Sequence, residues 1–230
     1  MILWCVNGYG QSSLTSKTYS FGVVGKGNGF GVAFKKVKQS NKQFNRVYYA
    51  DFTSFKHVSE AKVVNNKIEN RMPFVYGKLN HNGLIRLGYG VAKPLMQSNL
   101  ANSLTVGFQL NSGLTIGVQR PVYLRVEEVE DNLKTVKIVK YSPQVLTSAE
   151  SIVGYARNGS GWDELTVTPG VMANLSVNFT WNDYANIAKR LEIGAMLDYF
   201  PSGFDVMAFK PNPKLNPSFF VGFMWVINRG

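Results

Sequence analysis

The segment "LTVTPGVMANLSVNFT", residues 165–180, decides the fold class because its side chains alternate in character over its whole length. A β-strand directs alternate side chains to opposite faces, so this alternation predicts an amphipathic strand. At about 3.3 Å per residue the segment would extend about 50 Å, far more than the roughly five or six residues of a usual soluble strand. One parity is apolar and the other mostly small or polar: Leu165, Val167, Pro169, Val171, Ala173, Leu175, Val177 and Phe179 against Thr166, Thr168, Gly170, Met172, Asn174, Ser176, Asn178 and Thr180.

The same pattern recurs along the chain, and its polar face has an unusual composition. "LIRLGYGV", "SLTVGFQL", "LTIGVQRPVYL" and "RLEIGAMLDYF" all alternate in this way. Their polar positions are rich in Gly, Thr, Ser, Asn and Gln and poor in Lys and Glu, as in a narrow barrel interior rather than on a solvated face. Charged residues are 17% of the chain, against about 25% in an average soluble domain.

The connections between the expected strands alternate in length. Short, turn-like links lie at 40–42, 81–83, 111–113 and 181–188, and longer ones at 57–72, 95–101, 127–164 and 200–217. Outer-membrane barrels alternate short periplasmic turns with long extracellular loops. We therefore predict an all-β, antiparallel transmembrane β-barrel of 8–10 strands with long extracellular loops, integral to a bacterial outer membrane. The expected strands are 18–25, 29–38, 43–56, 73–80, 84–94, 102–110, 114–126, 165–180, 188–199 and 218–228.

The first expected hairpin leaves the strand count open. Its link, Lys26 to Asn28, is short where this topology calls for a long loop. Ten strands satisfy the even number that two periplasmic termini require. If residues 18–28 are instead a plug, an extension or part of one bent strand, the count falls to eight.

The C-terminal segment "PSFFVGFMWVINRG" is expected to close the barrel against the first strand. Five large apolar side chains share one face of it and are expected to meet lipid: Phe219, Val221, Phe223, Trp225 and Ile227. Tyr48, Tyr49, Trp162, Trp181 and Trp225 are the candidates for aromatic girdles at the membrane interfaces.

Four charged residues fall on expected inward faces: Lys78, Arg86, Glu192 and Asp198. Because both signs occur, they predict a buried ion-pair network that closes a narrow lumen. The alternative is a charged constriction in a small channel. An interior of eight to ten strands is roughly filled by side chains, which favours closure.

The longest connection, 127–164, is the candidate partner-binding loop, because connections of this length are uncommon unless they are functional. A solvated loop is the alternative. It carries an acidic patch followed by a basic one: Glu127, Glu128, Glu130 and Asp131, then Lys134, Lys137 and Lys140. A second basic cluster lies in "FKKVKQSNKQFNR", residues 34–46, and is expected to mark the membrane boundary or meet an acidic partner.

No catalytic, cofactor or metal site is expected. "GKGNGFG", residues 25–31, lacks the Lys-Ser/Thr ending of a phosphate-binding loop, and no helical pattern follows it. His57 and His81, the only two histidines, are expected at opposite ends of the barrel and so cannot share a metal. Cys5 is the single cysteine, which excludes a disulfide within the chain.

The N-terminal residues and the net charge of the chain each have two possible interpretations. Residues 1–11 are expected to be a remnant of a signal peptide, with one barrel domain over 12–230; an ordinary apolar N-terminus is the alternative. The net charge of +11 suits nucleic acid as well as anionic lipid or lipopolysaccharide.

Several segments resemble uncharacterised outer-membrane β-barrel proteins of the Bacteroidota: "PFVYGKLNHNGLIRLGYG", "RPVYL", "GWDELTVTPGV" and "LEIGAMLDYFPSGFDVMAF". The resemblance runs over most of the chain from about Tyr19. It implies a non-enzymatic barrel that serves as an accessory subunit of a larger outer-membrane complex, with other outer-membrane proteins as partners and no nucleic acid. A passive small-solute channel is the second hypothesis, and a soluble basic β-protein that binds nucleic acid is the third.

Overall fold

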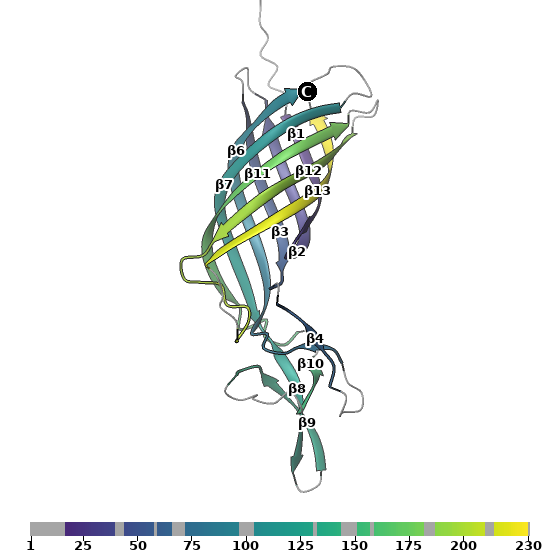
Figure 1. Cartoon of the computed structure of the whole chain (residues 1–230), viewed down its shortest axis with the longest axis vertical. Coiled ribbons are helices and arrows are strands. Elements are labelled where there is room, and N and C mark those ends of the chain that lie inside the picture. The colour runs from purple at the N-terminus through teal and green to yellow at the C-terminus, as the bar shows by residue number, and fades with distance from the viewer. Residues whose placement is uncertain are drawn as a thin grey trace, which may run out of the picture.

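Eight strands form one closed antiparallel barrel in the computed structural model, in the order β1-β2-β3-β6-β7-β11-β12-β13 (Figure 1). The structure describes residues 17–39, 44–57, 59–65, 72–96, 104–130, 133–143, 151–156, 159–181, 187–209 and 214–229. The barrel strands are β1 (Lys17–Lys26), β2 (Gly29–Lys38), β3 (Asn45–Phe55), β6 (Asn80–Met96), β7 (Leu104–Pro121), β11 (Thr166–Trp181), β12 (Ile187–Tyr199) and β13 (Leu215–Arg229). The predicted all-β antiparallel barrel is confirmed, with eight strands.

The barrel closes where the last strand pairs with the first. β13 runs antiparallel to β1 from Lys17 opposite Arg229 to Lys26 opposite Phe220. This confirms the predicted seam, and it gives every barrel strand a hydrogen-bonded neighbour on both sides. The first hairpin, in doubt from the sequence, belongs to the barrel because β1 also pairs with β2 along its length.

Two predicted turns were wrong, and this is why the count is eight and not ten. Residues 111–113 lie inside β7 and residues 81–83 inside β6. A Cβ on Gly113 would lie 2.1 Å from the carbonyl oxygen of Leu87 on β6. That glycine therefore permits close approach of two strands instead of a chain reversal. The predicted strand at 73–80 is also not a barrel strand: Phe74–Val75 (β5) pairs with Lys62–Val63 (β4), Lys78 forms an isolated bridge with Met207, and only Asn80 belongs to the barrel, as the first residue of β6.

The connections between barrel strands fall into two groups according to the end of the barrel at which they attach. The strand ends that flank 39–44, 97–103 and 182–186 lie at the barrel end where β1 begins and β13 ends, and those that flank the longer connections 56–79, 122–165 and 200–214 lie at the other end. The predicted long link at 95–101 begins inside β6, which extends to Met96, and the rest of this prediction lies outside the described residues. The tight turn at 27–28 is the exception at the long-loop end, where Asn28 accepts a backbone hydrogen bond from Lys56 at 2.7 Å.

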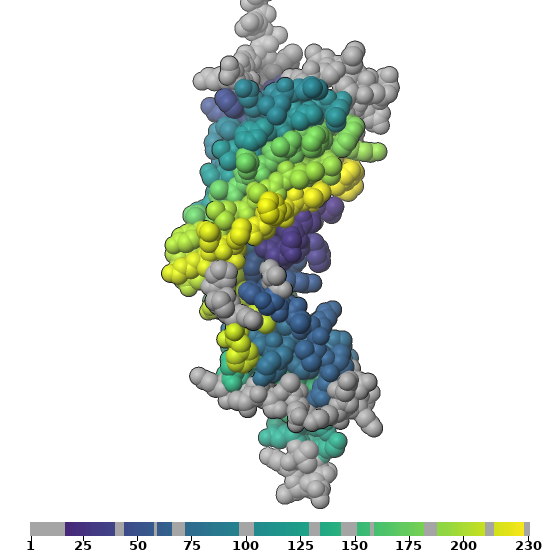
Figure 2. Space-filling view, in the orientation of Figure 1, coloured from purple at the N-terminus to yellow at the C-terminus, as the bar shows by residue number. Residues whose placement is uncertain are grey.

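The described residues of the three long connections form one folded unit below the barrel, which we call the head (Figures 1 and 2). Its sheet has the order β10-β8-β9, from Ile152–Tyr155 (β10), Tyr123–Glu130 (β8) and Leu133–Lys140 (β9). Phe74, Val122, Leu124, Tyr141 and Ile152 form its core. A second apolar cluster joins the head to the lower rim of the barrel: Phe55, Val75, Leu84, Phe200, Phe204, Val206 and Met207.

No helix among the described residues is long and apolar enough to cross a bilayer. The predicted signal-peptide remnant, residues 1–11, lies outside the described residues.

The close approach of β1 and β13 at the seam predicts different effects for two glycine substitutions. A Cβ at Gly22 would lie 2.0 Å from the carbonyl oxygen of Phe223, whereas one at Gly25 meets only the oxygen of Val221, at 3.9 Å. We expect Gly22→Ala to destabilise the folded barrel by about 1–3 kcal/mol through overpacking and Gly25→Ala to be neutral. Heat-modifiable migration and the thermal midpoint in detergent measure both; equal midpoints for the two variants would contradict the close approach.

Candidate functional site: a closed barrel interior and an ordered head

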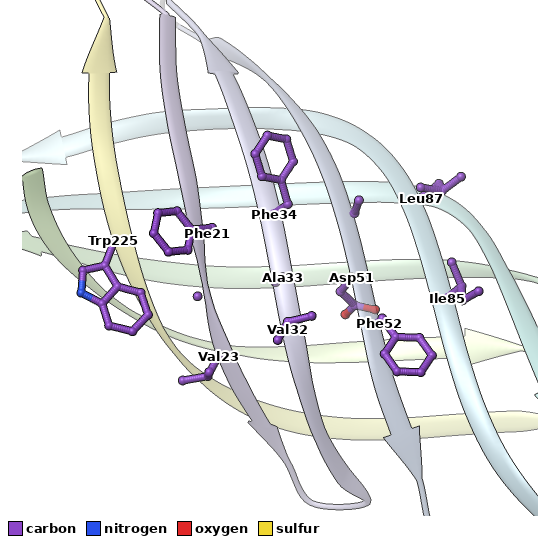
Figure 3. A pocket seen from close by; sticks show the side chains of 12 residues that line it. Phe21, Val23, Val32, Ala33, Phe34, Asp51, Phe52, Ile85, Leu87 and Trp225 are labelled. Atoms are coloured by element: carbon purple, nitrogen blue, oxygen red, sulfur yellow. The ribbon is translucent and has the colours of Figure 1, made fainter.

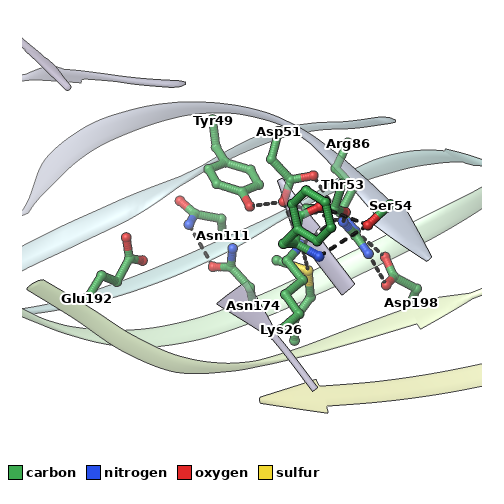
Figure 4. Close-up of polar contacts among 12 residues, drawn as sticks. Lys26, Tyr49, Asp51, Thr53, Ser54, Arg86, Asn111, Asn174, Glu192 and Asp198 are labelled. Carbon is green, nitrogen blue, oxygen red and sulfur yellow. Dashed lines mark hydrogen bonds and ion pairs between the residues drawn. The ribbon is translucent and has the colours of Figure 1, made fainter. Parts of the chain in front are cut away.

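The barrel interior holds a cluster of buried charges centred on Arg86 (Figure 4). Its Nε and Nη2 donate to the two carboxylate oxygens of Asp198 on β12, each at 2.7 Å. Its Nη1 donates to Asp51 Oδ1 at 3.0 Å and to Thr53 Oγ1 at 2.7 Å on β3. A guanidinium fork shared between two carboxylates ties three strands together across the lumen.

Asp51 is the second centre of this cluster. Its Oδ2 accepts from Lys26 Nζ at 2.7 Å, and it also accepts a hydrogen bond from the hydroxyl of Tyr49. Arg86 and Lys26 thus face Asp51 and Asp198, and the two signs balance. Neutral clusters of this kind are stable inside a protein only when each charge keeps its partners.

A separate ion pair lies deeper in the barrel. Lys35 on β2 pairs with Glu192 on β12, and Ser176 on β11 donates to Glu192 Oε1 at 2.6 Å. Lys35 and Glu192 each have about 1% of their surface exposed. Asn111 Nδ2 also donates to Asn174 Oδ1 at 2.7 Å across β7 and β11. These groups reach across the interior from several strands, so buried side chains occupy the lumen.

Of the four predicted lumen residues, the structure brings three into the interior. Arg86 pairs with Asp198, while Glu192 pairs with Lys35, which the sequence had placed only in a basic cluster. Lys78 lies in the head, where its Nζ is 2.7 Å from Glu60 Oε2. Lys26 and Asp51 were not predicted to lie in the lumen. Both occupy alternate positions of β1 and β3 that face inward, so the alternation pattern could have identified them.

Between the two ends of the barrel, the outward side chains of the described strands are apolar or small. The five predicted side chains of the final strand point outward, and Phe219 is 81% exposed. Tyr48, Trp181 and Trp225 also point outward, but the prediction for Tyr49 was wrong because its ring is buried inside. Trp162 lies in the head, where it stacks on Arg120 with the guanidinium 5.0 Å from the ring centroid.

The predicted partner loop is ordered over much of its length as the β8–β9 hairpin of the head. Its acidic and basic residues do not form two patches, because they pair across the hairpin. Glu127 pairs with Lys134 at 3.0 Å and Glu128 with Lys137 at 2.5 Å, while Lys140 pairs with Glu164. Asp131 lies outside the described residues, as does the side chain of Glu130.

Among the described side chains of this hairpin, two large apolar ones are exposed. Val136 and Ile138 on β9 are each 57% exposed, next to the paired charges. β9 is also the edge of the described three-stranded sheet. Exposed apolar side chains on an edge strand are typical of a contact surface.

Both histidines lie at the head end of the molecule, so the prediction of opposite ends was wrong. His57 follows β3, and His81 begins β6 and packs on Tyr155 of β10, with ring centroids 5.4 Å apart. Among the described residues no group of three or more His, Cys, Asp or Glu is placed to hold a metal. Burial, with Lys78 and Arg120 nearby, lowers the pKa of His81 to about 4.

No protein-family model matches this chain, and no curated protein matches it. Among solved structures it is similar to Neisserial surface protein A (NspA), at 8% identity over 92% of this chain and 95% of that chain, with a TM-score of 0.41. It is also similar to Ail, the attachment invasion locus protein of Yersinia pestis, at 8% identity over 94% of this chain and 99% of that chain, again with a TM-score of 0.41. The barrel architecture itself rests on the strand pairing described above.

The Lys35–Glu192 pair predicts a strongly non-additive double mutant. Lys35→Met leaves a buried carboxylate without its cation and should cost about 3–5 kcal/mol. Lys35→Met combined with Glu192→Leu should recover part of this loss, because the carboxylate that had lost its cation is removed, while Arg190, the other buried cation near Glu192, keeps its hydrogen bond to Thr180 at 2.9 Å. Chemical unfolding in lipid vesicles gives the free energies. The exposed pair supplies the control: Lys134→Met should cost at most about 1 kcal/mol. If the losses in free energy of unfolding caused by Lys35→Met and Glu192→Leu simply add in the double mutant, the pairing of these two side chains is contradicted.

The lowered pKa of His81 predicts a pH dependence of stability. The folded state favours neutral His81, whereas the unfolded chain protonates near pH 6.5. His81 therefore stabilises the fold fully above about pH 6.5 and loses this contribution as the pH falls toward 4. Thermal midpoints of wild type and His81→Gln measured across this window should converge as the pH falls. A constant difference between the two proteins would show that His81 is not held neutral.

Proposed function

We propose that this chain is an integral outer-membrane barrel that does not conduct and that holds the head outside the cell as a contact module for other outer-membrane proteins. The observation that carries the proposal is the polarity of the wall. On the eight described strands, outward side chains between the two ends are apolar or small, while the charges of Arg86, Asp51 and Glu192 are buried inside. A soluble barrel has the opposite arrangement, with a solvated outside.

The orientation follows from the connections. Short turns and both termini at one end, with long loops at the other, match periplasmic and extracellular sides respectively. Outward cations support this, since Lys17, Lys36, Lys38, Arg46, Lys93 and Lys189 all lie near the terminal end of their strands. We call these six residues the basic collar. They would meet the phosphates of the inner leaflet and mark one boundary of the membrane.

The filled interior argues against the passive channel. Arg86 pairs with Asp198 and Lys35 pairs with Glu192 between strands that are not neighbours in the barrel, and conduction would require these buried pairs to separate. An interior of eight strands is already close to filled by side chains. Planar-bilayer recordings of the purified protein should therefore show no stepwise conductance.

The head supports the accessory-subunit role. Its core and the apolar cluster at the barrel rim fix it to the wall, so the β8–β9 hairpin is presented on a rigid base. The resemblance of the sequence to Bacteroidota barrels supports the same role. Lipopolysaccharide around the outer rim is the expected lipid partner at the head end.

Contact through the hairpin can be tested by mild-detergent purification of the tagged barrel from its native membrane after cross-linking. We expect partners cross-linked by wild type to fall at least fivefold with Val136→Ser/Ile138→Ser. The matched control is Val63→Ser/Val64→Ser, which removes two equally small apolar side chains, each 42% exposed, from another part of the head. It should keep the partners. Recovery of the barrel alone, or equal loss in both variants, would overturn the contact role.

Membrane integration has a separate test. The protein should fractionate with outer membranes, require detergent for extraction and migrate differently before and after boiling. Purification as a detergent-free soluble monomer would overturn this proposal and favour the third hypothesis, a basic soluble β-protein.

A further inference from the structure

A groove of about 450 Å³ lies on the outer wall over the strands β13, β1, β2, β3 and β6 (Figure 3). Its size falls within the roughly 300–1,000 Å³ of ligand pockets. The walls are the outward side chains of Phe21, Phe34, Phe52, Leu87 and Trp225, and the lining is almost entirely carbon.

The sequence creates this groove through one small residue. Ala50 lies opposite Phe34 on β2 and opposite Leu87 on β6. It therefore leaves a gap in a row of large side chains. Phe21 and Trp225 stack at one side, with ring centroids 5.5 Å apart, and give the groove a firm wall.

Immediately beyond the groove, toward the terminal end, the outward row becomes aromatic and basic. Lys36 lies opposite Tyr19 on β1 and opposite Tyr48 on β3. Its Nζ is 5.6 Å from the centroid of the Tyr19 ring. At about 3.3 Å per residue, this row lies about 7 Å from the level of Phe34.

The next row holds three exposed cations side by side. Lys38 lies opposite Lys17 on β1 and opposite Arg46 on β3. Like charges directly opposite each other destabilise a sheet unless an anion lies between them. Asp51 is the only acidic residue of β1, β2 and β3, and it is buried inside the barrel. These strands therefore supply no counter-charge on the outward face.

We propose that this groove and the cations above it form a specific site for one anionic phospholipid of the inner leaflet. An acyl chain lies in the gap at Ala50, and the phosphate accepts hydrogen bonds from Lys36, Lys38 and Arg46. Apolar groove, aromatic row and cation row follow one another in the order of acyl chain, interface and headgroup. The proposal rests on the membrane location and orientation proposed above.

The test is native mass spectrometry of the detergent-solubilised, delipidated full chain titrated with phosphatidylglycerol or phosphatidylcholine. We expect one phosphatidylglycerol to be retained, at least tenfold more tightly than phosphatidylcholine. Lys36→Gln/Lys38→Gln should weaken retention about tenfold. The control Lys93→Gln/Lys189→Gln removes two cations of the basic collar that lie away from the groove, and it should bind like wild type.

A second variant tests the groove itself. Ala50→Phe fills the gap and leaves every cation in place, so it should lose retention while it keeps heat-modifiable migration. Equal retention of the two lipids, equal loss in the control, or unchanged binding by Ala50→Phe would overturn the lipid site. A dimer in wild type that Ala50→Phe abolishes would overturn it in favour of a second copy of the chain. Heat-modifiable migration, measured on the same samples, reports separately whether the barrel is membrane-integrated.

Discussion

Closure of the barrel requires that every strand of this chain pair on both sides, and most other features follow from that constraint. The seam between β1 and β13 is the last pairing that closes the ring. An open edge would present unpaired backbone donors and acceptors, which a hydrocarbon environment cannot satisfy. Closing a ring of only eight strands also makes the interior narrow. The narrowness explains glycines such as Gly22 and Gly113, where a neighbouring backbone lies too close for any side chain.

The narrow interior also explains the pattern of charges. Arg86 has room for few neighbours, and those neighbours are two carboxylates and a hydroxyl supplied by β3 and β12. A single unpaired charge here would be costly, whereas a fully paired cluster joins strands that are far apart in the sequence. The interior therefore combines this polar cluster with a buried apolar cluster that includes Val24, Met172 and Phe220, and many other large apolar side chains lie exposed on the outer wall.

The head depends on the barrel in a different way. Its strands are short, and a small sheet of this kind has little apolar surface of its own to bury. Contacts at the rim, through Phe55, Phe204 and Met207, extend the buried surface from the head into the barrel mouth. The long connections are thereby held in place, and the β8–β9 hairpin is presented as a defined surface. The groove at Ala50 lies on the barrel wall and the hairpin lies in the head, so the two proposed contacts use different residues.

Alternation along residues 165–180 and along the final strand predicted amphipathic strands, since alternate side chains of a strand face opposite sides. The composition of the polar faces and the alternating lengths of the connections were also needed to predict an antiparallel barrel with an apolar outside. Parity also assigned Arg86, Glu192 and Asp198 to the interior. The number of strands could not be predicted in this way. Asn and Gly at 111–113 are typical of a turn, but they are equally typical of a crowded barrel interior. Only the close approach of β6 to Gly113 in the tertiary structure shows that these residues continue a strand. Pairing partners were likewise decided by tertiary structure. Lys35 and Glu192 are separated by 157 residues, and their meeting depends on curvature and register that no local pattern contains. The groove has the same origin, since Ala50 becomes a gap only when β2 and β6 place Phe34 and Leu87 beside it.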